Sequence, residues 1–215
     1  HKWNYMGHSL INGMITGVAQ PVLAQVTDDK ERQLRVFRKM MRLTAFVSFP
    51  AMFGLSLTAP ELITLAITDK WLPSALFMQI LCIGGAFLPL SNLFSQLLLS
   101  RGHSSTYMWC TIALSILQLA TAYIAYPYGI QTMLLAFITV NTGWIVVWLH
   151  FVHREIGLTF FSFLKDICPY LLLSGVLVIL AHYATLDIES TGIRLACKIA
   201  GVGGCYLFIL WLMKS

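Results

Sequence analysis

Basic residues repeat on one face of a helix predicted near the start of the chain. An acidic residue and three arginines follow the spacing i, i+4, i+7 and i+11: Glu31, Arg35, Arg38 and Arg42. Guanidinium groups bind phosphate through two parallel N–H donors, so part of this stripe would suit a phosphate-bearing substrate. The positive-inside rule and contact with anionic lipid headgroups would produce the same stripe. The sequence leaves both interpretations open.

Uncharged polar residues form two further candidate surfaces. Pro89 lies inside a long apolar segment, and Asn92 and Gln96 follow it one helical turn apart. A proline frees a backbone carbonyl, which a cavity or a neighbouring side chain must satisfy. The second surface lies on or beside one face of the first apolar segment and includes Lys2, His8 and Asn12. Both sets fit a polar pathway, and both fit ordinary interhelical hydrogen bonds or an interfacial anchor.

The sequence contains no motif that predicts catalysis, a metal or a cofactor. Its five cysteines have no CxxC spacing and mostly lie in apolar segments, which indicates packed thiols. His150 and His153 share a helical face, but neither a third ligand nor an HExxH motif accompanies them. A P-loop, a GxSxG motif and a convincing carboxylate pair are also missing. We therefore expect a protein that is not an enzyme and that has neither a metal nor a cofactor.

The amino-acid composition indicates the type of secondary structure that carries these candidate residues. Of the 215 residues, 58% are hydrophobic and 11% are charged, and the mean hydropathy is +0.76. Such values, with apolar segments of about 18–25 residues, are typical of membrane-spanning helices. We predict an all-α, polytopic membrane helix bundle with about seven transmembrane helices. The predicted segments are 6–26, 40–58, 72–100, 105–126, 129–152, 169–184 and 193–212.

Charges are distributed unevenly around these segments. Ten of the fourteen Lys and Arg residues fall on one side of the membrane when the loops alternate, and this side is predicted to be cytoplasmic. The net charge of +5 therefore indicates topology, and no nucleic-acid partner is expected. Segments 72–100, 105–126 and 129–152 contain no Asp, Glu, Lys or Arg. Because ionisable residues inside a membrane are usually functional, we expect no buried carboxylate for proton coupling in this chain.

Several short motifs follow one another in an order that resembles a known family. They are PVLA at 21–24, an acidic turn at Asp28 and Asp29, a basic helix start, a return segment broken at Pro50 and Gly54, APELI at 59–63, KWLP at 70–73 and SRG at 100–102. From Lys2 to about Tyr126, the chain resembles the polysaccharide biosynthesis flippases of the multidrug, oligosaccharidyl-lipid and polysaccharide exporter superfamily. Beyond Tyr126 only the hydropathy matches.

The resemblance implies a two-lobe transporter of about fourteen helices, of which this chain would be the C-terminal part. Residues 1–155 would belong to the C-terminal lobe as helices eight to twelve, and residues 156–215 would form two terminal helices. The N-terminal lobe, which precedes His1 in this interpretation, would complete a central cavity that opens alternately to each side.

The implied function is transport of an undecaprenyl-pyrophosphate-linked oligosaccharide across the bacterial cytoplasmic membrane. Membrane lipids and polysaccharide polymerase machinery would be its other partners. A cation-coupled multidrug exporter of the same superfamily and a non-transport scaffold subunit of a polysaccharide synthase stay open as alternatives. The sugar, the coupling ion and the oligomeric state are not predicted. The expected substrate-binding residues are Lys2, His8, Asn12, Arg38, Arg42, Asn92 and Gln96.

Overall fold

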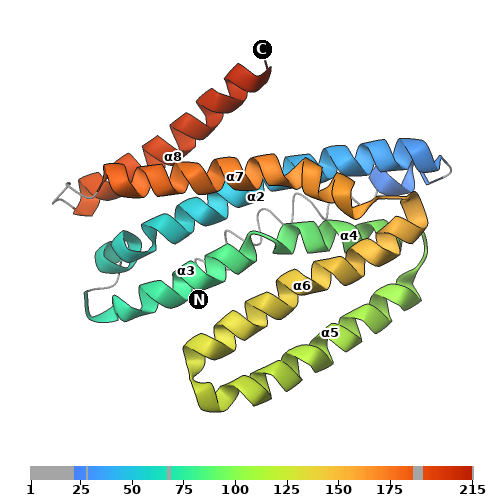
Figure 1. Ribbon diagram of the computed structural model, residues 1–215, viewed down its shortest axis with the longest axis horizontal. Coiled ribbons are helices and arrows are strands. Elements are labelled where there is room, and N and C mark those ends of the chain that lie inside the picture. Colours follow the sequence, from blue (N-terminus) through green and yellow to red (C-terminus); the bar gives the residue numbers. More distant parts are fainter. Residues whose placement is uncertain (1–21, 28, 67–68, 186–190, 215) are drawn as a thin grey trace. The chain divides into compact units, whose positions relative to one another are not determined.

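The regular structure of the chain is helical. The structure, a computed structural model, describes residues 22–27, 29–66, 69–185 and 191–214, and no strand occurs among them (Figure 1). The elements are α2 (Lys30–Ala66), η1 (Asp69–Trp71), α3 (Pro73–Gly85), α4 (Leu88–Ser100), α5 (Ser104–Ala125), η2 (Tyr126–Tyr128), α6 (Ile130–Ile156), α7 (Phe160–Ala184) and α8 (Thr191–Lys214).

Several of these helices are long and apolar enough to cross a membrane. Five such spans occur in the part of the chain that the structure describes: Lys30–Ala66, Pro73–Ser100, Ser104–Tyr128, Ile130–Ile156 and Phe160–Ala184. The predicted all-α, polytopic membrane bundle is therefore confirmed. The first predicted segment, 6–26, lies almost entirely outside the described residues.

Helix α2 is much longer than the predicted segment 40–58. Its first turn is capped by Asp29, whose Oδ1 accepts a hydrogen bond from the backbone N–H of Arg32 at 3.0 Å. The helix then continues through Pro50 and Pro60 to Ala66. A proline removes a single backbone hydrogen bond, and membrane helices tolerate that loss. The basic stripe and the apolar return segment therefore belong to one element.

Pro89 begins a helix instead of kinking one. The predicted segment 72–100 is interrupted, because α3 ends at Gly85 and α4 begins at Leu88. Pro89 lies in the first turn of α4, where its missing N–H would have had no helical partner. The predicted segment still matches one membrane-length span, Pro73–Ser100, whose helix is broken just before Pro89.

The chain divides into two compact units. Unit 1 comprises residues 1–48 and 87–167, and unit 2 comprises residues 49–86 and 168–215. The division of the chain into a C-terminal lobe, 1–155, and two terminal helices, 156–215, stays a prediction.

Aromatic packing holds the helices of unit 1 together. The rings of Phe37 in α2 and Phe163 in α7 each lie with their centroids 5.6 Å from the ring of Phe94 in α4. Phe37 and Phe94 are completely buried. Helices α5 and α6 run side by side as a hairpin (Figure 1), and Gln118 donates a hydrogen bond to Asn141 Oδ1 at 3.0 Å between them. This bond joins the two helices through polar side chains.

Small residues allow close packing in unit 2. A Cβ atom added to Gly85 in α3 would lie 2.5 Å from Met52 Cε in α2. Ser56 Oγ also donates a hydrogen bond to the carbonyl oxygen of Gln79, at 3.3 Å. Unit 2 thus joins the second half of α2 to α3.

Candidate functional site

Two of the predicted binding residues, Arg38 and Arg42, converge on one buried carboxylate, Asp166 in α7. Arg38 donates from Nε to Oδ2 at 2.6 Å and from Nη2 to Oδ1 at 2.9 Å. Arg42 donates to Oδ1 from Nε at 2.9 Å and from Nη2 at 2.6 Å. The Asp166 side chain is only 2% exposed. We call these three residues the arginine cluster, and all of them belong to unit 1.

The local sequence explains why the cluster forms. Arg38 and Arg42 are four residues apart, so they share one face of α2. Phe37 precedes the first arginine, and Phe163 lies one turn before Asp166 in α7. Because both phenylalanines contact Phe94, the aromatic core fixes α2 and α7 at the distance that the ion pairs need.

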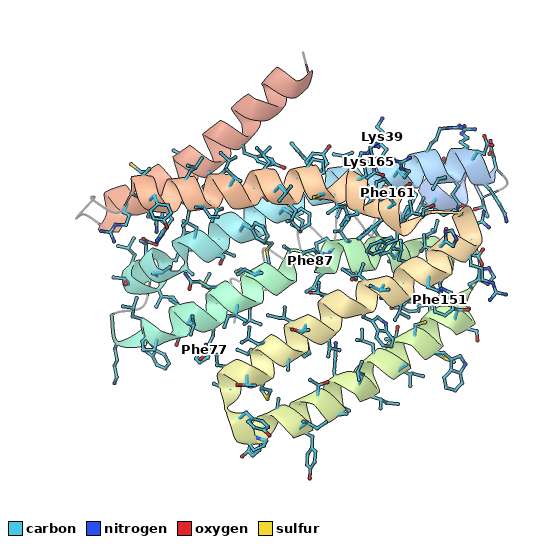
Figure 2. The ribbon with its side chains drawn as sticks, viewed as in Figure 1. Lys39, Phe77, Phe87, Phe151, Phe161 and Lys165 are labelled. Atoms are coloured by element: carbon cyan, nitrogen blue, oxygen red, sulfur yellow. The ribbon has the colours of Figure 1, made fainter. Side chains whose placement is uncertain are left out.

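The cluster keeps a net positive charge and an outward face. Two guanidinium groups and one carboxylate leave a formal charge of +1. The Arg38 and Arg42 side chains are 32% and 49% exposed, so they remain partly in contact with solvent. Lys39 and Lys165, which flank the cluster in sequence, are exposed and lie near one another in Figure 2. The surface around the cluster is therefore basic.

A second ion-pair network connects α2, α6 and the residues that follow α4 within unit 1. Arg101, just after α4, donates to Glu155 Oε2 in α6 at 3.2 Å and to Gln33 Oε1 in α2 at 2.8 Å. His103 Nε2 lies 3.2 Å from Glu155 Oε1. Arg101 is 10% exposed and Glu155 is 21% exposed. We interpret this network as structural, because its charges are turned toward each other and toward buried Gln33.

The predicted residues of α4 are half-buried in unit 1. Asn92 and Gln96 have intermediate exposure, and Gln96 Oε1 is a buried oxygen without a hydrogen-bond partner in the described part of the chain. Ser95 instead bonds back to its own helix, to the carbonyls of Ser91 and Asn92. The hydrogen bonds of the arginine cluster do not include Gln96. Its unsatisfied oxygen marks α4 as a place where a polar partner would be stabilising.

The remaining predicted positions fall elsewhere. Lys2, His8 and Asn12 lie outside the described residues. Nδ1 of His153 lies 3.0 Å from the carbonyl oxygen of Leu158, and His150 is exposed. Within the described ranges, no three His, Cys, Asp or Glu residues gather as metal ligands would.

Two buried carboxylates contradict the expectation that this chain has none. Asp166 is 3% exposed and Glu61 is 5% exposed as whole residues. Both acids lie outside the predicted membrane segments, because one of these ends at residue 58 and another begins at residue 169. Helices α2 and α7 extend past those limits and carry the two acids into the protein. Their partners, Arg38, Arg42 and Lys198, neutralise them in space but are far away in sequence.

Similar proteins connect this chain to polysaccharide biosynthesis. A family model described as a polysaccharide biosynthesis protein matches residues 1–76. An uncharacterized membrane protein in the cps region of Klebsiella pneumoniae is 36% identical over 93 residues, which are 43% of this chain and 19% of that protein.

Two further relatives have names that state a process. The teichuronic acid biosynthesis protein TuaB of Bacillus subtilis is 27% identical over 207 residues, covering 93% of this chain and 42% of TuaB. The lipopolysaccharide biosynthesis protein WzxC of Escherichia coli is 29% identical over 91 residues, covering 42% of this chain and 18% of WzxC. The matched regions span less than half of each of the three relatives. No solved structure is significantly similar.

These matches agree with the resemblance predicted from the motifs. They cover the N-terminal third of the chain through the family model and nearly its whole length through TuaB. The apolar helices and the bacterial membrane relatives also confirm a multi-pass bacterial membrane protein. The chain is similar to polysaccharide biosynthesis membrane proteins, over residues 1–76 by the family model and over most of its length by TuaB.

Proposed function

We propose that this chain is part of a flippase that moves an undecaprenyl-pyrophosphate-linked oligosaccharide across the bacterial cytoplasmic membrane, and that the arginine cluster binds its diphosphate. One observation carries the proposal: Arg38 and Arg42 are held by a single buried carboxylate while remaining partly exposed. The names of WzxC and TuaB support a role in building a cell-surface polymer.

The geometry suits a phosphate ligand for two reasons. Asp166 occupies the Nε and Nη2 groups of each arginine, and the Nη1 groups make no hydrogen bond to the described residues. Because Asp166 already fixes both arginine side chains, they lose less side-chain entropy on binding an anion than unrestrained arginines would. The cluster lies at the end of α2 that the positive-inside rule predicts to be cytoplasmic, where a lipid-linked precursor would enter.

The physical task also favours a basic polar route. A diphosphate headgroup cannot cross bare hydrocarbon without a large loss of hydration free energy. Asn92 and Gln96 would continue the route along α4, and Lys2, His8 and Asn12 would do so along the first segment. The N-terminal lobe of a longer protein would supply the other wall, and membrane lipids would accommodate the polyprenyl tail. A protein of this kind works beside polysaccharide polymerase machinery and needs no bond-making catalysis of its own.

The test compares arginines of the same helix. In a strain deleted for the gene, we would express the full-length protein with Arg38→Ala plus Arg42→Ala, and with Arg35→Ala as the matched control. Arg35 is exposed, and among the described residues its ion pair is with exposed Glu31, at 3.7 Å. Losing charged hydrogen bonds worth about 1.5–3 kcal/mol should lower surface polymer about tenfold or more and make the lipid-linked intermediate accumulate.

Protein level in the membrane fraction separates binding from folding. Arg38→Lys plus Arg42→Lys keeps the charge beside Asp166 but loses the planar fork, so an intermediate polymer yield is expected. If the double alanine variant keeps normal polymer output at a normal protein level, the basic stripe serves topology alone.

The multidrug-exporter alternative gains one observation from the structure. Buried Glu61 supplies the kind of carboxylate that cation-coupled exporters use and that the sequence analysis did not expect. Cysteines introduced at Asn92 and Gln96, labelled from each side of the membrane, would show alternating exposure in either transporter and fixed exposure in a scaffold subunit. Surface polymer output in the same strains distinguishes the flippase, whose loss lowers it, from the multidrug exporter, whose loss does not.

A further inference from the structure

The first two turns of α7 present an apolar and basic face on the outside of unit 1. Phe160, Phe161 and Leu164 are exposed, Phe161 by 74%, and Lys165 is exposed as well. Because an α-helix has about 3.6 residues per turn, these four positions share one side of α7. Three large apolar side chains and one charge therefore lie on the same exposed face.

The inner side of the same turns holds this face in place. Phe163 packs on Phe94 at 5.6 Å between ring centroids, and Asp166 binds the two arginines of α2. Phe163 and Asp166 are buried. Because these contacts fix the rotation of α7, its outer side chains cannot turn into the core. The exposure of Phe160 and Phe161 is therefore a consequence of how unit 1 packs.

A lysine of α2 extends the same surface. Arg38 and Asp166 are in contact, and their sequence neighbours Lys39 and Lys165 are both exposed. Figure 2 shows Lys39, Lys165 and Phe161 close together. Neither lysine takes part in an ion pair among the described residues. We use the name lysine–phenylalanine surface for the set Lys39, Phe160, Phe161, Leu164 and Lys165.

The two halves of this surface need a ligand that is itself amphipathic. The lysines attract an anion, whereas the apolar side chains are stabilised by an apolar cover. A free phosphate or a nucleic-acid backbone would satisfy the lysines alone. An anionic phospholipid carries its phosphate next to acyl chains, so it matches both halves. We propose that the lysine–phenylalanine surface binds an anionic phospholipid of the cytoplasmic leaflet.

The position of the surface along α7 supports a lipid ligand. Helix α7 is one of the membrane-length helices, and the surface lies at its N-terminal end. Leu172 and Val176 follow Lys165 by seven and eleven residues, at the same helical register, and both are exposed. Exposed apolar residues at one register are typical of a lipid-facing stripe. Lysines at the end of such a stripe extend their flexible stems toward the headgroups.

This site is separate from the arginine cluster and does not rest on the proposed flippase activity. Arg38 and Arg42 direct their Nε and Nη2 donors at Asp166. The ammonium groups of Lys39 and Lys165 make no such bond to the described residues, so their donors are available to a headgroup. A lipid bound here would contact α2 and α7 together and would stabilise the folded protein.

The experiment is thermal unfolding of the purified full-length protein in nanodiscs, with phosphatidylglycerol replacing phosphatidylcholine stepwise. Phosphatidylglycerol should raise the Tm of wild type by about 2 °C or more. Lys39→Gln plus Lys165→Gln should lose most of this rise and keep the wild-type Tm in pure phosphatidylcholine. Lys70→Gln is the matched control, because Lys70 is an exposed lysine beside exposed Trp71 in unit 2. This control should keep the rise.

A binding measurement separates the lipid from free phosphate. Native mass spectrometry in detergent gives the affinity for added phosphatidylglycerol. The double lysine variant should weaken this affinity about tenfold or more, because each lysine near an anionic headgroup contributes about fivefold. Phe160→Ser plus Phe161→Ser should weaken it as well. Any effect of inorganic phosphate on Tm should be equal in wild type and in the lysine variant, because phosphate alone would act at the arginine cluster.

Three results would overturn the proposal. If the double lysine variant keeps the rise, or if Lys70→Gln loses as much of it, the lipid acts through the general charge of the protein. If the phenylalanine variant binds phosphatidylglycerol normally, the surface is an anion site without an acyl-chain contact. The third result needs no change of a lysine: a nitroxide on Phe161→Cys, in a background without the native cysteines, is shielded from both lipid-dissolved oxygen and a water-soluble paramagnetic reagent. Another protein segment would then cover the surface.

Discussion

Replacing Asp166 by Asn should destabilise the protein, because one carboxylate holds two arginines. Asp166 accepts four hydrogen bonds from Arg38 and Arg42. Breaking a fully buried ion pair costs about 3–5 kcal/mol of unfolding free energy. The arginine side chains here are 32% and 49% exposed, so water recovers part of that loss. We expect a cost of about 2–4 kcal/mol, which lowers Tm by about 4–8 °C in a large chain.

The assay is thermal unfolding of the purified full-length protein with a dye that fluoresces when it reacts with thiols. Cys82 and Cys110 are buried, so in a background with half-buried Cys168 and exposed Cys197 replaced by Ser they report the loss of packing. Glu31→Gln is the control, because it removes an exposed carboxylate of α2 that lies 3.7 Å from exposed Arg35. That control should shift Tm by no more than about 1 °C.

A double-mutant cycle isolates the pair itself. In a background of Arg38→Gln and Arg42→Gln, changing Asp166 to Asn should no longer destabilise the protein, since the buried carboxylate has already lost its cations. If Asp166→Asn melts within about 1 °C of wild type, as the exposed control does, then solvent screens these contacts. The cluster would then be a loose surface network and not a preorganised anion site.

Two further predictions concern the helices that frame unit 1. Gln118→Leu should cost about 0.6 kcal/mol, the average for an interhelical hydrogen bond in a membrane, because it removes the bond to Asn141; an unchanged Tm in the same assay would mean that this bond contributes nothing. Gly157→Ala should destabilise by about 1–2 kcal/mol, because Gly157 has φ 73° although the space around it is open. Gly143→Ala, at an equally open position inside α6, should instead be neutral or stabilising by up to about 1 kcal/mol; equal effects at both glycines would refute the backbone argument.

Local pattern predicted the helices and half of the candidate site. The four-residue spacing of Arg38 and Arg42 put them on one face of α2, as the structure has them. Hydropathy found the membrane-length helices because each spans about 20 or more apolar residues. These signals arise from neighbours in sequence, so the chain need not be folded to show them.

The partners could not be found in the same way. Asp166 lies 124 residues after Arg42, and Lys198 lies 137 residues after Glu61. Hydropathy treats each of these charges as a reason to end a membrane segment, although an ion pair allows the helix to continue. The α2 and α7 limits were therefore drawn too short, and both buried acids were assigned to loops. The helical spacing of the basic residues before residue 40 was the signal that α2 begins earlier than the predicted segment 40–58.

The two ion pairs differ in a way that assigns them different tasks. In unit 1, the acid is buried while its arginines keep half or a third of their side-chain surface exposed, so an incoming anion can contact them without breaking the pair. In unit 2, the acid and the lysine are both about 5% exposed, so a large ligand is excluded. Exposure of the cation decides between the two, because a guanidinium facing water recruits phosphate, whereas an ammonium sealed beside a carboxylate responds to the charge of that carboxylate.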